Sequence, residues 1–429
     1  MKKRSNITVM AKLIGLVRPL TGYMILAIFL GLLGHLCASL LTVFGGYALL
    51  GIAGVYKVPT GFVFTLLLVC AFARGFLRYG EQSCNHFIAF KLLALLRDRV
   101  FFALRRLSPA KLEGRDRGDL IAVITSDIEL LEVFYAHTIS PAVIAFLFTV
   151  TACVFIGSFY PLLGGVALVA YLTVGLLVPF LLSKANGDNG LRFRERSGAL
   201  SGFVLDSLRG LSETIQYGQG AERLRRMNEQ TDALAEDEAR MKRLAGRGTA
   251  VTGAVILTAD LVMLVCASFL YQGGAVGLDG VLIPTLALMS SFGPVVALAN
   301  LGSTLQNTFA AGNRVLDILE EKPQVEEVTG KEKVTFRDAG AEQVTFSYGS
   351  ETILSDVSCK IPANTVTGII GKSGSGKSTL LKLFLRFFEV KQGEIKISGV
   401  PVADINTSDL RAMESYICLL YTSPSPRDR

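Results

Sequence analysis

The sequence predicts an all-α bundle of six transmembrane helices, followed by the first part of an α/β P-loop nucleotide-binding domain. Three observations support this fold class. Of 429 residues, 51% are hydrophobic and only 18% are charged, whereas soluble domains carry about 25% charged residues. Six long apolar runs lie within the first 301 residues. A strand-like run then leads into the glycine-rich stretch GIIGKSGSGKSTLLKLF at 368–384.

Each of the six runs is long enough to cross a membrane. A hydrocarbon core about 30 Å thick needs roughly 20 apolar residues in a helix, which satisfies its own backbone hydrogen bonds. The second run is the weakest, because Arg74 and Arg78 fall at its end. The runs are Tyr23–Leu50, Val58–Leu77, Ile139–Tyr160, Leu162–Leu182, Thr249–Tyr271 and Val281–Leu301.

Positive charge alternates along the links between these runs. Lysine and arginine are dense before the first run, between the second and third, and from 183 to 248. The link to the second run carries only Lys57, and the links after the third and fifth runs carry neither residue. By the positive-inside rule both termini are cytoplasmic. The net charge of +7 therefore reflects orientation in a lipid bilayer, and we expect no nucleic-acid partner.

The two long cytoplasmic links are predicted to be helical. FIAFKLLALLRDRVFFALRRL and ALSGFVLDSLRGLSETI carry apolar residues at three- and four-residue spacing. Helices in these links would extend beyond the membrane and meet a cytosolic domain.

The composition changes after the sixth run. We expect a membrane domain over 1–318, a charged linker over 319–333, the N-terminal part of a nucleotide-binding domain over 334–417, and a tail over 418–429. The segments KVTFRDAG, EQVTFSYG and NTVTGII have the pattern of strands, and STLLKLFLRFF that of a helix. A parallel sheet built from so few strands would lack neighbours, so we expect marginal order in this part.

The order strand, glycine loop, helix is the context that a P-loop requires. Gly371, Gly374 and Gly376 allow backbone N–H groups to turn toward phosphate, and the helix presents its positive end to the same anion. Lys377 would reach the outer phosphates, and Ser378 would hold Mg²⁺. The ATP contacts would be completed by Lys372, Ser373, Ser375 and Thr379. A chance match to the pattern is the alternative. From its spacing alone, Tyr348 could equally be a ring that stacks on adenine or a plain tyrosine of an edge strand.

The chain resembles the exporter type of ATP-binding-cassette (ABC) transporter over nearly its whole length, to about Ile417. The resemblance rests on the six spans with long cytoplasmic helices, on the segment from FSYGSETILSDVS through the P-loop to EIKISG, and on SDLRAM. It implies that Tyr348 stacks on adenine. It also implies that Gly114–Asp127 and Leu205–Gln216 are coupling helices. Without the family, those stretches are solvated turns with Asp127 or Asp206 as surface charges.

The sequence departs from this family after LRAMESYI. A glutamine loop, a signature loop, a Walker B strand with its glutamate and a switch histidine should follow, but the chain reads CLLYTSPSPRDR. This ending resembles a translated sequencing adapter; a natural frayed tail is the alternative. Positioning and charge catalyse phosphoryl transfer, so we expect this polypeptide to bind ATP and Mg²⁺ without hydrolysing ATP.

Two polar residues inside the apolar runs are candidates for a substrate path. Asp260 stands near the middle of the fifth run, where a charge costs about 2.5–3.5 kcal/mol by insertion scales. His35 lies in the first run. The alternatives are a protonated or paired aspartate that joins two helices and a neutral, hydrogen-bonded histidine.

The resemblance implies a half-transporter that dimerises with a second half and exports a small molecule, lipid or peptide across the bacterial inner membrane, with transport ATPase activity in the intact protein. One alternative is a non-hydrolysing subunit of a heterodimeric exporter, of thiols or amino acids for example. Another is a membrane-tethered P-loop kinase or ATP sensor, which would move no substrate.

Overall fold

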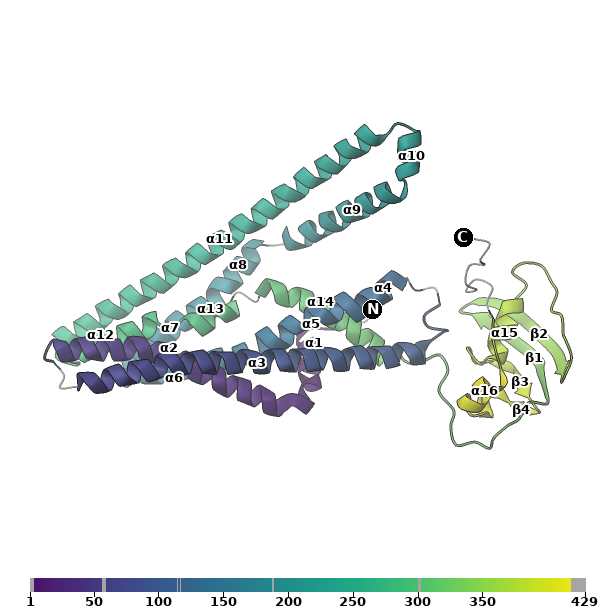
Figure 1. Ribbon diagram of the computed structural model, residues 1–429, viewed down its shortest axis with the longest axis horizontal. Coiled ribbons are helices and arrows are strands. Elements are labelled where there is room, and N and C mark those ends of the chain that lie inside the picture. Colours follow the sequence, from purple (N-terminus) through teal and green to yellow (C-terminus); the bar gives the residue numbers. More distant parts are fainter. Residues whose placement is uncertain are drawn as a thin grey trace. The chain divides into compact units, whose positions relative to one another are not determined.

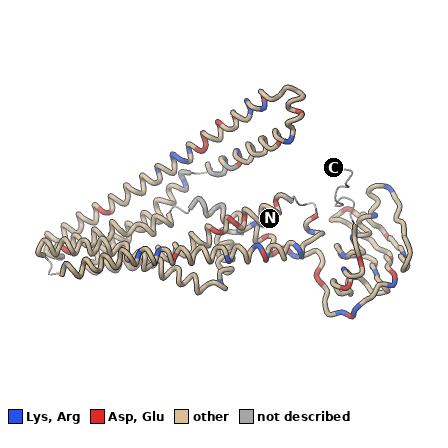
Figure 2. The backbone as a smooth tube through the Cα atoms, viewed as in Figure 1, with Lys and Arg blue, Asp and Glu red and all other residues tan. Residues whose placement is uncertain are grey.

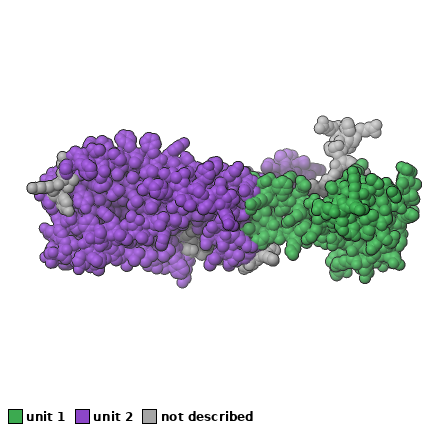
Figure 3. Space-filling model, turned by 90° about the horizontal axis from the view of Figure 1, so that it is seen from below, with its two compact units in different colours: residues 1, 97–124, 315–429 green, residues 2–96, 125–314 purple. Residues whose placement is uncertain are grey.

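The computed structural model describes residues 4–55, 59–113, 115, 117–186, 189–299 and 302–417 (Figure 1). The chain divides into two compact units, which Figure 3 shows in different colours. Unit 2 comprises residues 2–96 and 125–314, and unit 1 comprises residues 1, 97–124 and 315–429.

Long helices make up unit 2 and the adjoining part of unit 1. In the first half of the chain they are α1 (Asn6–Leu16), η1 (Arg18–Leu20), α2 (Thr21–Ile52), α3 (Thr60–Leu107), α4 (Arg117–Ala122), η2 (Val123–Asp127), α5 (Ile128–Phe134), η3 (Tyr135–Ile139), α6 (Ser140–Gly157), α7 (Pro161–Leu172), η4 (Thr173–Leu177) and α8 (Val178–Asn186). They continue as α9 (Asn189–Arg209), α10 (Leu211–Gln216), α11 (Gly220–Gln272), α12 (Leu278–Met289), α13 (Gly293–Ala299) and α14 (Gly302–Glu320).

The prediction of six membrane spans is confirmed. Among the described residues, six helical stretches are long and apolar enough to cross a membrane, one for each predicted run. Large apolar side chains such as Phe72, Phe76 and Val154 are exposed along these stretches. In a bilayer such side chains meet lipid or another helix instead of water, so this exposure is what a membrane protein requires. The chain is an integral, multi-pass membrane protein.

Small residues bring the helices of unit 2 close together. A Cβ on Gly164 of α7 would lie 2.8 Å from the Gly157 Cα of α6, and a Cβ on Gly46 of α2 would lie 2.7 Å from Leu286 of α12. Around these contacts α2, α6, α7, α11, α12 and α13 bury one apolar cluster, which includes Ile156, Leu163, Met263 and Ile283. Close backbone approach is how membrane helices gain packing energy.

Prolines stand close to two of the π-helical turns in these helices. Val178 separates η4 from Pro179, and Ser140 separates η3 from Pro141. Proline supplies no N–H and clashes with the preceding turn, and a wider turn relieves both problems. The sixth predicted run is interrupted at Ser290–Phe292, just before Pro294, so it consists of α12 and α13 instead of one helix.

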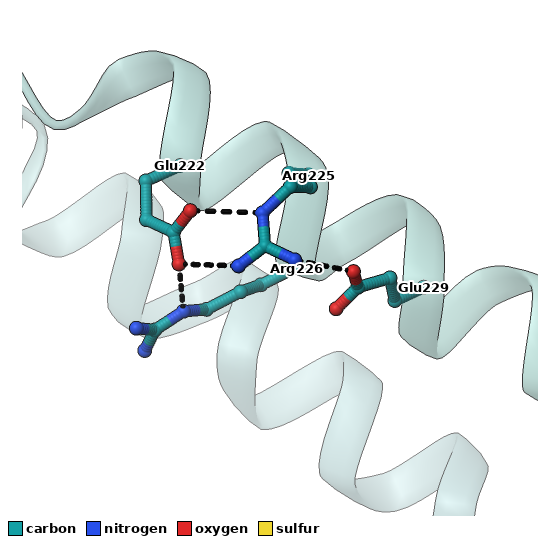
Figure 4. A network of polar contacts seen from close by, with 4 residues as sticks. All are labelled: Glu222, Arg225, Arg226 and Glu229. Atoms are coloured by element: carbon teal, nitrogen blue, oxygen red, sulfur yellow. Dashed lines mark hydrogen bonds and ion pairs between the residues drawn. The ribbon is translucent and has the colours of Figure 1, made fainter.

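The first part of α11 is the most charged helical segment of unit 2 (Figure 2). Glu222 accepts hydrogen bonds from Arg225 and Arg226, and Arg225 also pairs with Glu229 (Figure 4). The hydrogen bonds from these two arginines lower the pKa of Glu222 to about 2. The pairs lie at the surface, where water screens them, so they add little to the stability of the helix.

Unit 1 contains a four-stranded sheet with one helix packed on it. The strands are β1 (Asp338–Tyr348), β2 (Glu351–Pro362), β3 (Gln392–Ile397) and β4 (Val400–Pro401), in the order β2-β1-β3-β4. The helical elements are α15 (Lys377–Phe384), η5 (Val402–Asp404) and α16 (Thr407–Met413). Gly349 is the first residue of the tight turn between β1 and β2. Its φ of +61° is positive, as the tight turns of β-hairpins require at this position.

The predicted strand pattern of this unit is wrong in two respects. All pairings among the described strands are antiparallel, because β1 forms a hairpin with β2 and takes β3 on its other edge. The predicted strand NTVTGII forms no ladder: residues 365–372 are irregular, and Val366 is 102% exposed. KVTFRDAG joins the sheet only from Asp338 onward. One apolar cluster that includes Val344, Leu383 and Ile395 packs α15 against this sheet, and the marginal order of this part stays a prediction.

Candidate functional site

The glycine loop has the conformation that makes glycine necessary. Gly374 and Gly376 have φ values of +82° and +87°, in the left-handed region that other residues rarely adopt. A Cβ on Gly376 would also lie 2.7 Å from the Leu354 side chain. Gly376 is the N-cap of α15, so the loop delivers the chain directly into the first turn of that helix. Unpaired backbone N–H groups at a helix start favour an anion.

Lys377 lies folded over this loop. Its Nζ donates hydrogen bonds to the carbonyl oxygens of Gly371, at 3.0 Å, and Lys372, at 2.7 Å. The Ser375 Oγ lies 3.4 Å from the same nitrogen. The ammonium group is thus centred on the concave side of the loop, where it could turn to phosphate oxygens without leaving the site.

The other predicted phosphate contacts differ in exposure. Ser373, Ser375 and Ser378 are exposed, whereas the side chain of Thr379 is buried, with 8% exposure. The exposed Ser378 hydroxyl in the first turn of α15 could serve as one oxygen ligand of Mg²⁺, which takes an octahedral set of oxygens. The residues present therefore fit a nucleotide phosphate with its magnesium ion.

Tyr348 ends β1 beside two phenylalanine rings. Its ring centroid lies 4.9 Å from that of Phe346 and 5.2 Å from that of Phe388, both in edge-to-face geometry. The tyrosine is 38% exposed, whereas the two phenylalanines are buried. The rings of Phe346 and Phe388 thus hold the Tyr348 ring in place, and part of the tyrosine surface stays accessible. This arrangement allows a planar base to stack on it.

The loop after α3 contacts the nucleotide-binding part within unit 1. Ala110 packs against the apolar cluster of the sheet, and Glu113 forms an ion pair with Lys382 on α15. Arg115 donates two hydrogen bonds to Glu321, at 2.7 and 2.8 Å. Burial lowers the pKa of Lys382, but the hydrogen bond and charge of Glu113 outweigh it, so the net pKa is raised. Sequence reasoning missed Glu113 and Lys382, which no motif marks.

The two stretches that resemble coupling helices differ from each other in structure. Gly114 and Asp116 lie outside the described residues, and residues 117–127 run through α4 and η2. Leu205–Gln216 covers the end of α9 and the short helix α10, which connects α9 to α11 (Figure 1). Asp206 is exposed, as predicted for a surface charge. The same prediction for Asp127 is wrong, because its carboxylate is buried and pairs with Arg314 of α14 at 2.5 Å.

The two membrane candidates lie in separate polar clusters. Asp260 of α11 is 8% exposed, and its Oδ1 has no hydrogen-bond partner among the described residues. The Tyr171 hydroxyl, which is also buried in unit 2, lies 2.5 Å from the Ser291 Oγ. The His35 Nε2 of α2 lies 3.4 Å from the Arg78 Nη1 of α3. The structure thus gives His35 a charged neighbour, whereas it leaves one oxygen of Asp260 unsatisfied.

Comparison with known proteins agrees with these features. Residues 24–295 match the ABC transporter transmembrane region, and residues 354–421 match the family description "ABC transporter". A probable ABC transporter ATP-binding/permease protein of Haemophilus influenzae is 40% identical over 97% of this chain and 76% of its own length. The glutathione/L-cysteine transport system protein CydC of Escherichia coli is 29% identical over 88% and 67% of the two chains.

More distant relatives and a solved structure agree as well. An ATP-dependent lipid A-core flippase of Desulfotalea psychrophila is 25% identical over 81% of this chain and 61% of its own length. The structure of a bacterial Atm1-family ABC exporter with ATP bound shares the fold, with a TM-score of 0.73 at 17% identity over 92% of this chain and 70% of that one. With its six spans and its P-loop domain, the chain belongs to the ABC transporter family.

Proposed function

We propose that this chain is one half of a dimeric ABC exporter and that ATP binding at residues 371–379 drives its transport cycle. The observation that carries the proposal is a P-loop centred on Lys377, in the same chain as six membrane-spanning stretches. In this proposal Ser378 holds Mg²⁺ and Tyr348 stacks on the adenine. Both chain termini are cytoplasmic, and the host membrane is a bacterial inner membrane.

In this proposal, ATP binding and ATP hydrolysis depend on different groups of the nucleotide-binding domain. The P-loop supplies backbone N–H groups and one ammonium group, which stabilise phosphate charge. Cleavage also needs a group that orients the attacking water and groups that stabilise charge on the far side of the γ-phosphate. The printed sequence has no signature loop, Walker B glutamate or switch histidine. We therefore propose that this polypeptide binds ATP without hydrolysing it, and that a complete nucleotide-binding domain hydrolyses it.

The second half is either another copy or a related chain. CydC, which matches 88% of this chain, is named as a protein of a glutathione/L-cysteine transport system. The lipid A-core flippase matches 81% at lower identity. A small thiol or amino acid is therefore the first substrate class to test, and a lipid is the second.

Transport into inside-out vesicles tests the proposal directly. The protein would be expressed with a complete nucleotide-binding domain, alone and with its neighbouring partner gene, and supplied with radiolabelled cysteine, glutathione or lipid. ATP-dependent accumulation that Lys377→Ala abolishes would support the exporter. A kinase or sensor would consume or bind ATP and move nothing, which would contradict it.

The same assay tests Asp260 as part of a substrate path. We expect Asp260→Asn to lower uptake, because a carboxylate on the substrate path would contact the cargo and the substitution removes its charge. Uptake equal to that of the unmodified protein would exclude Asp260 from the path.

A further inference from the structure

The sixth membrane span is broken inside the bilayer. Residues Ser290–Phe292 separate α12 from α13 and are not helical. Pro294 has no N–H to donate to the carbonyl oxygen of Ser290, and the Ser39 hydroxyl of α2 donates to that oxygen instead, at 3.4 Å. Backbone that leaves the helix at this depth is tolerated only where protein covers it. The break is therefore stabilised by the side chains around it.

Two neighbouring helices each bring a polar side chain to this break. The Tyr171 hydroxyl of α7 lies 2.5 Å from the Ser291 Oγ, and the Tyr171 ring centroid lies 5.3 Å from that of Phe292. The same hydroxyl interacts electrostatically with the Asp260 carboxylate of α11. Met263, three residues after Asp260, belongs to the same apolar cluster as Tyr171 and Phe292. The side of α11 that carries Asp260 therefore faces Tyr171 and the break.

The Tyr171 hydroxyl has one proton and two possible acceptors. The Ser291 Oγ donates its own proton to the Leu288 carbonyl oxygen at 2.7 Å, so it accepts in its pair with Tyr171. The Asp260 Oδ1 is the second acceptor, and it is buried without a hydrogen-bond partner among the described residues. The three residues thus allow two mutually exclusive hydrogen-bond arrangements, of which the structure shows the one with Ser291.

Each arrangement leaves a different group without a partner. With Tyr171 on Ser291, the buried carboxylate of Asp260 has no donor, which is unfavourable because its charge is neither hydrated nor paired. With Tyr171 on Asp260, the carboxylate gains a charge-assisted hydrogen bond, but the break loses the contact that ties Ser291 to α7. The gain at one group offsets the loss at the other, which is what a two-state element requires.

The break lies in the span that leads to the nucleotide-binding unit. The chain continues from α13 through α14, and residues from 315 onward belong to unit 1. α13 packs against the π-turn η4, since a Cβ on Gly175 would lie 2.8 Å from Val295. Serine, glycine and proline at a helix break, and π-turns, are where helices bend, often at functional sites. A change of angle at the break would move α13 relative to α12.

We propose that Ser290–Phe292 is a hinge of the transport cycle and that Tyr171 controls it by exchanging one hydrogen bond. The hydroxyl binds Ser291 in the state that the structure shows, and it binds Asp260 in a second state, in which α13 turns freely. The link to transport rests on the proposed function, whereas the exchange itself does not. An aspartate that only joined two helices would have its partner in place, and the Asp260 Oδ1 has none among the described residues.

Hydrogen–deuterium exchange of backbone amides measures how often the hinge opens. The full chain would be placed in nanodiscs, and the peptide that spans 288–296 would be followed by mass spectrometry. Ser291→Ala removes the acceptor of the first arrangement, so we expect exchange of this peptide to rise about fivefold, the factor of one hydrogen bond. Asp260→Leu removes the acceptor of the second arrangement, so exchange should fall by a similar factor. Asp260→Asn keeps an acceptor oxygen and should lower exchange less.

Matched variants separate the hydrogen-bond exchange from general loosening. Thr258→Val removes a hydroxyl that bonds to the Ala254 carbonyl within α11, and it should leave the peptide unchanged. In a Tyr171→Phe background, where neither acceptor receives a proton, Asp260→Leu should have no further effect. Exchange that rises or stays unchanged in Asp260→Leu, or a fall that persists in the Tyr171→Phe background, would overturn the inference and leave the exporter proposal standing.

Discussion

At the scale of single residues, the nucleotide site depends on a few side chains placed by backbone geometry. Gly374 and Gly376 allow the loop to turn, and Lys377 fills its concave side. These positions could be predicted from the sequence, because the P-loop pattern encodes local geometry directly. The partners of Tyr348 could not, since Phe388 follows α15 and meets the tyrosine only after the sheet and helix pack.

Replacement of Tyr348 tests the adenine contact. Stacking of a base on an aromatic ring is worth about 1–3 kcal/mol, so Tyr348→Ala should weaken ATP binding about fivefold to a hundredfold, whereas Tyr348→Phe should bind nearly as well as the original. Fluorescence titration with a labelled ATP analogue measures both. Equal losses in the two variants would show that the ring face is not what binds the base.

The pair of Asp127 and Arg314 should stabilise unit 2. The aspartate side chain is 4% exposed but the arginine is 35% exposed, so we expect Asp127→Ala to cost about 1–3 kcal/mol, below the 3–5 kcal/mol of a fully buried pair. Thermal unfolding in detergent measures the loss. In a double-mutant cycle with Arg314→Ala, additive effects would mean that the two charges do not stabilise each other.

At the scale of elements, the sequence predicts the membrane helices well and the sheet poorly. Apolar length alone identifies a span, because a helix satisfies its own backbone in lipid. A strand such as that predicted over 364–370 depends on neighbours, and none of the described strands pairs with it. The π-turns near Pro141 and Pro179 could be predicted only in part. The sequence shows the prolines, but it does not show that the helix widens into a π-turn beside them.

The contact of the 108–113 loop with α15 can be tested by exchanging charges. Glu113→Lys or Lys382→Glu alone should loosen the loop, because like charges would then face each other, and the double exchange should restore the contact. Limited proteolysis between α3 and α4 reports on the loop. The pair is partly exposed, so we expect an effect of about 1 kcal/mol or less. Failure of the double variant to recover protection would rule out a direct pairing.

The segment before the P-loop should bind hydrophobic dyes. Val366 and Ile370 are 102% and 95% exposed, and an exposed apolar segment invites association. In this polypeptide Val366→Ser with Ile370→Ser should therefore lower anilinonaphthalene sulfonate fluorescence and aggregation. Lys360→Ser, at a residue of β2 that is already polar, is the matched control. An unchanged dye signal would mean that these side chains are covered in solution.

At the scale of the whole molecule, a membrane unit and a nucleotide-binding unit occur in one chain. The fold class and the family could be predicted from the sequence, because span length and the P-loop pattern both reflect local requirements. The contacts of Arg78 could not be identified in this way. In the sequence, Arg74 and Arg78 only weaken the second run, and the contact of Arg78 with His35 forms only where α2 and α3 pack together.

ATP binding and hydrolysis by the purified 429-residue polypeptide test the central claim most directly. Filter binding of radiolabelled ATP with Mg²⁺ would be measured beside phosphate release, with Lys377→Ala and the exposed control Lys391→Ala. We expect ATP binding that Lys377→Ala abolishes and Lys391→Ala preserves, with no phosphate release from any form. Phosphate release by the unmodified polypeptide that disappears in Lys377→Ala would contradict it.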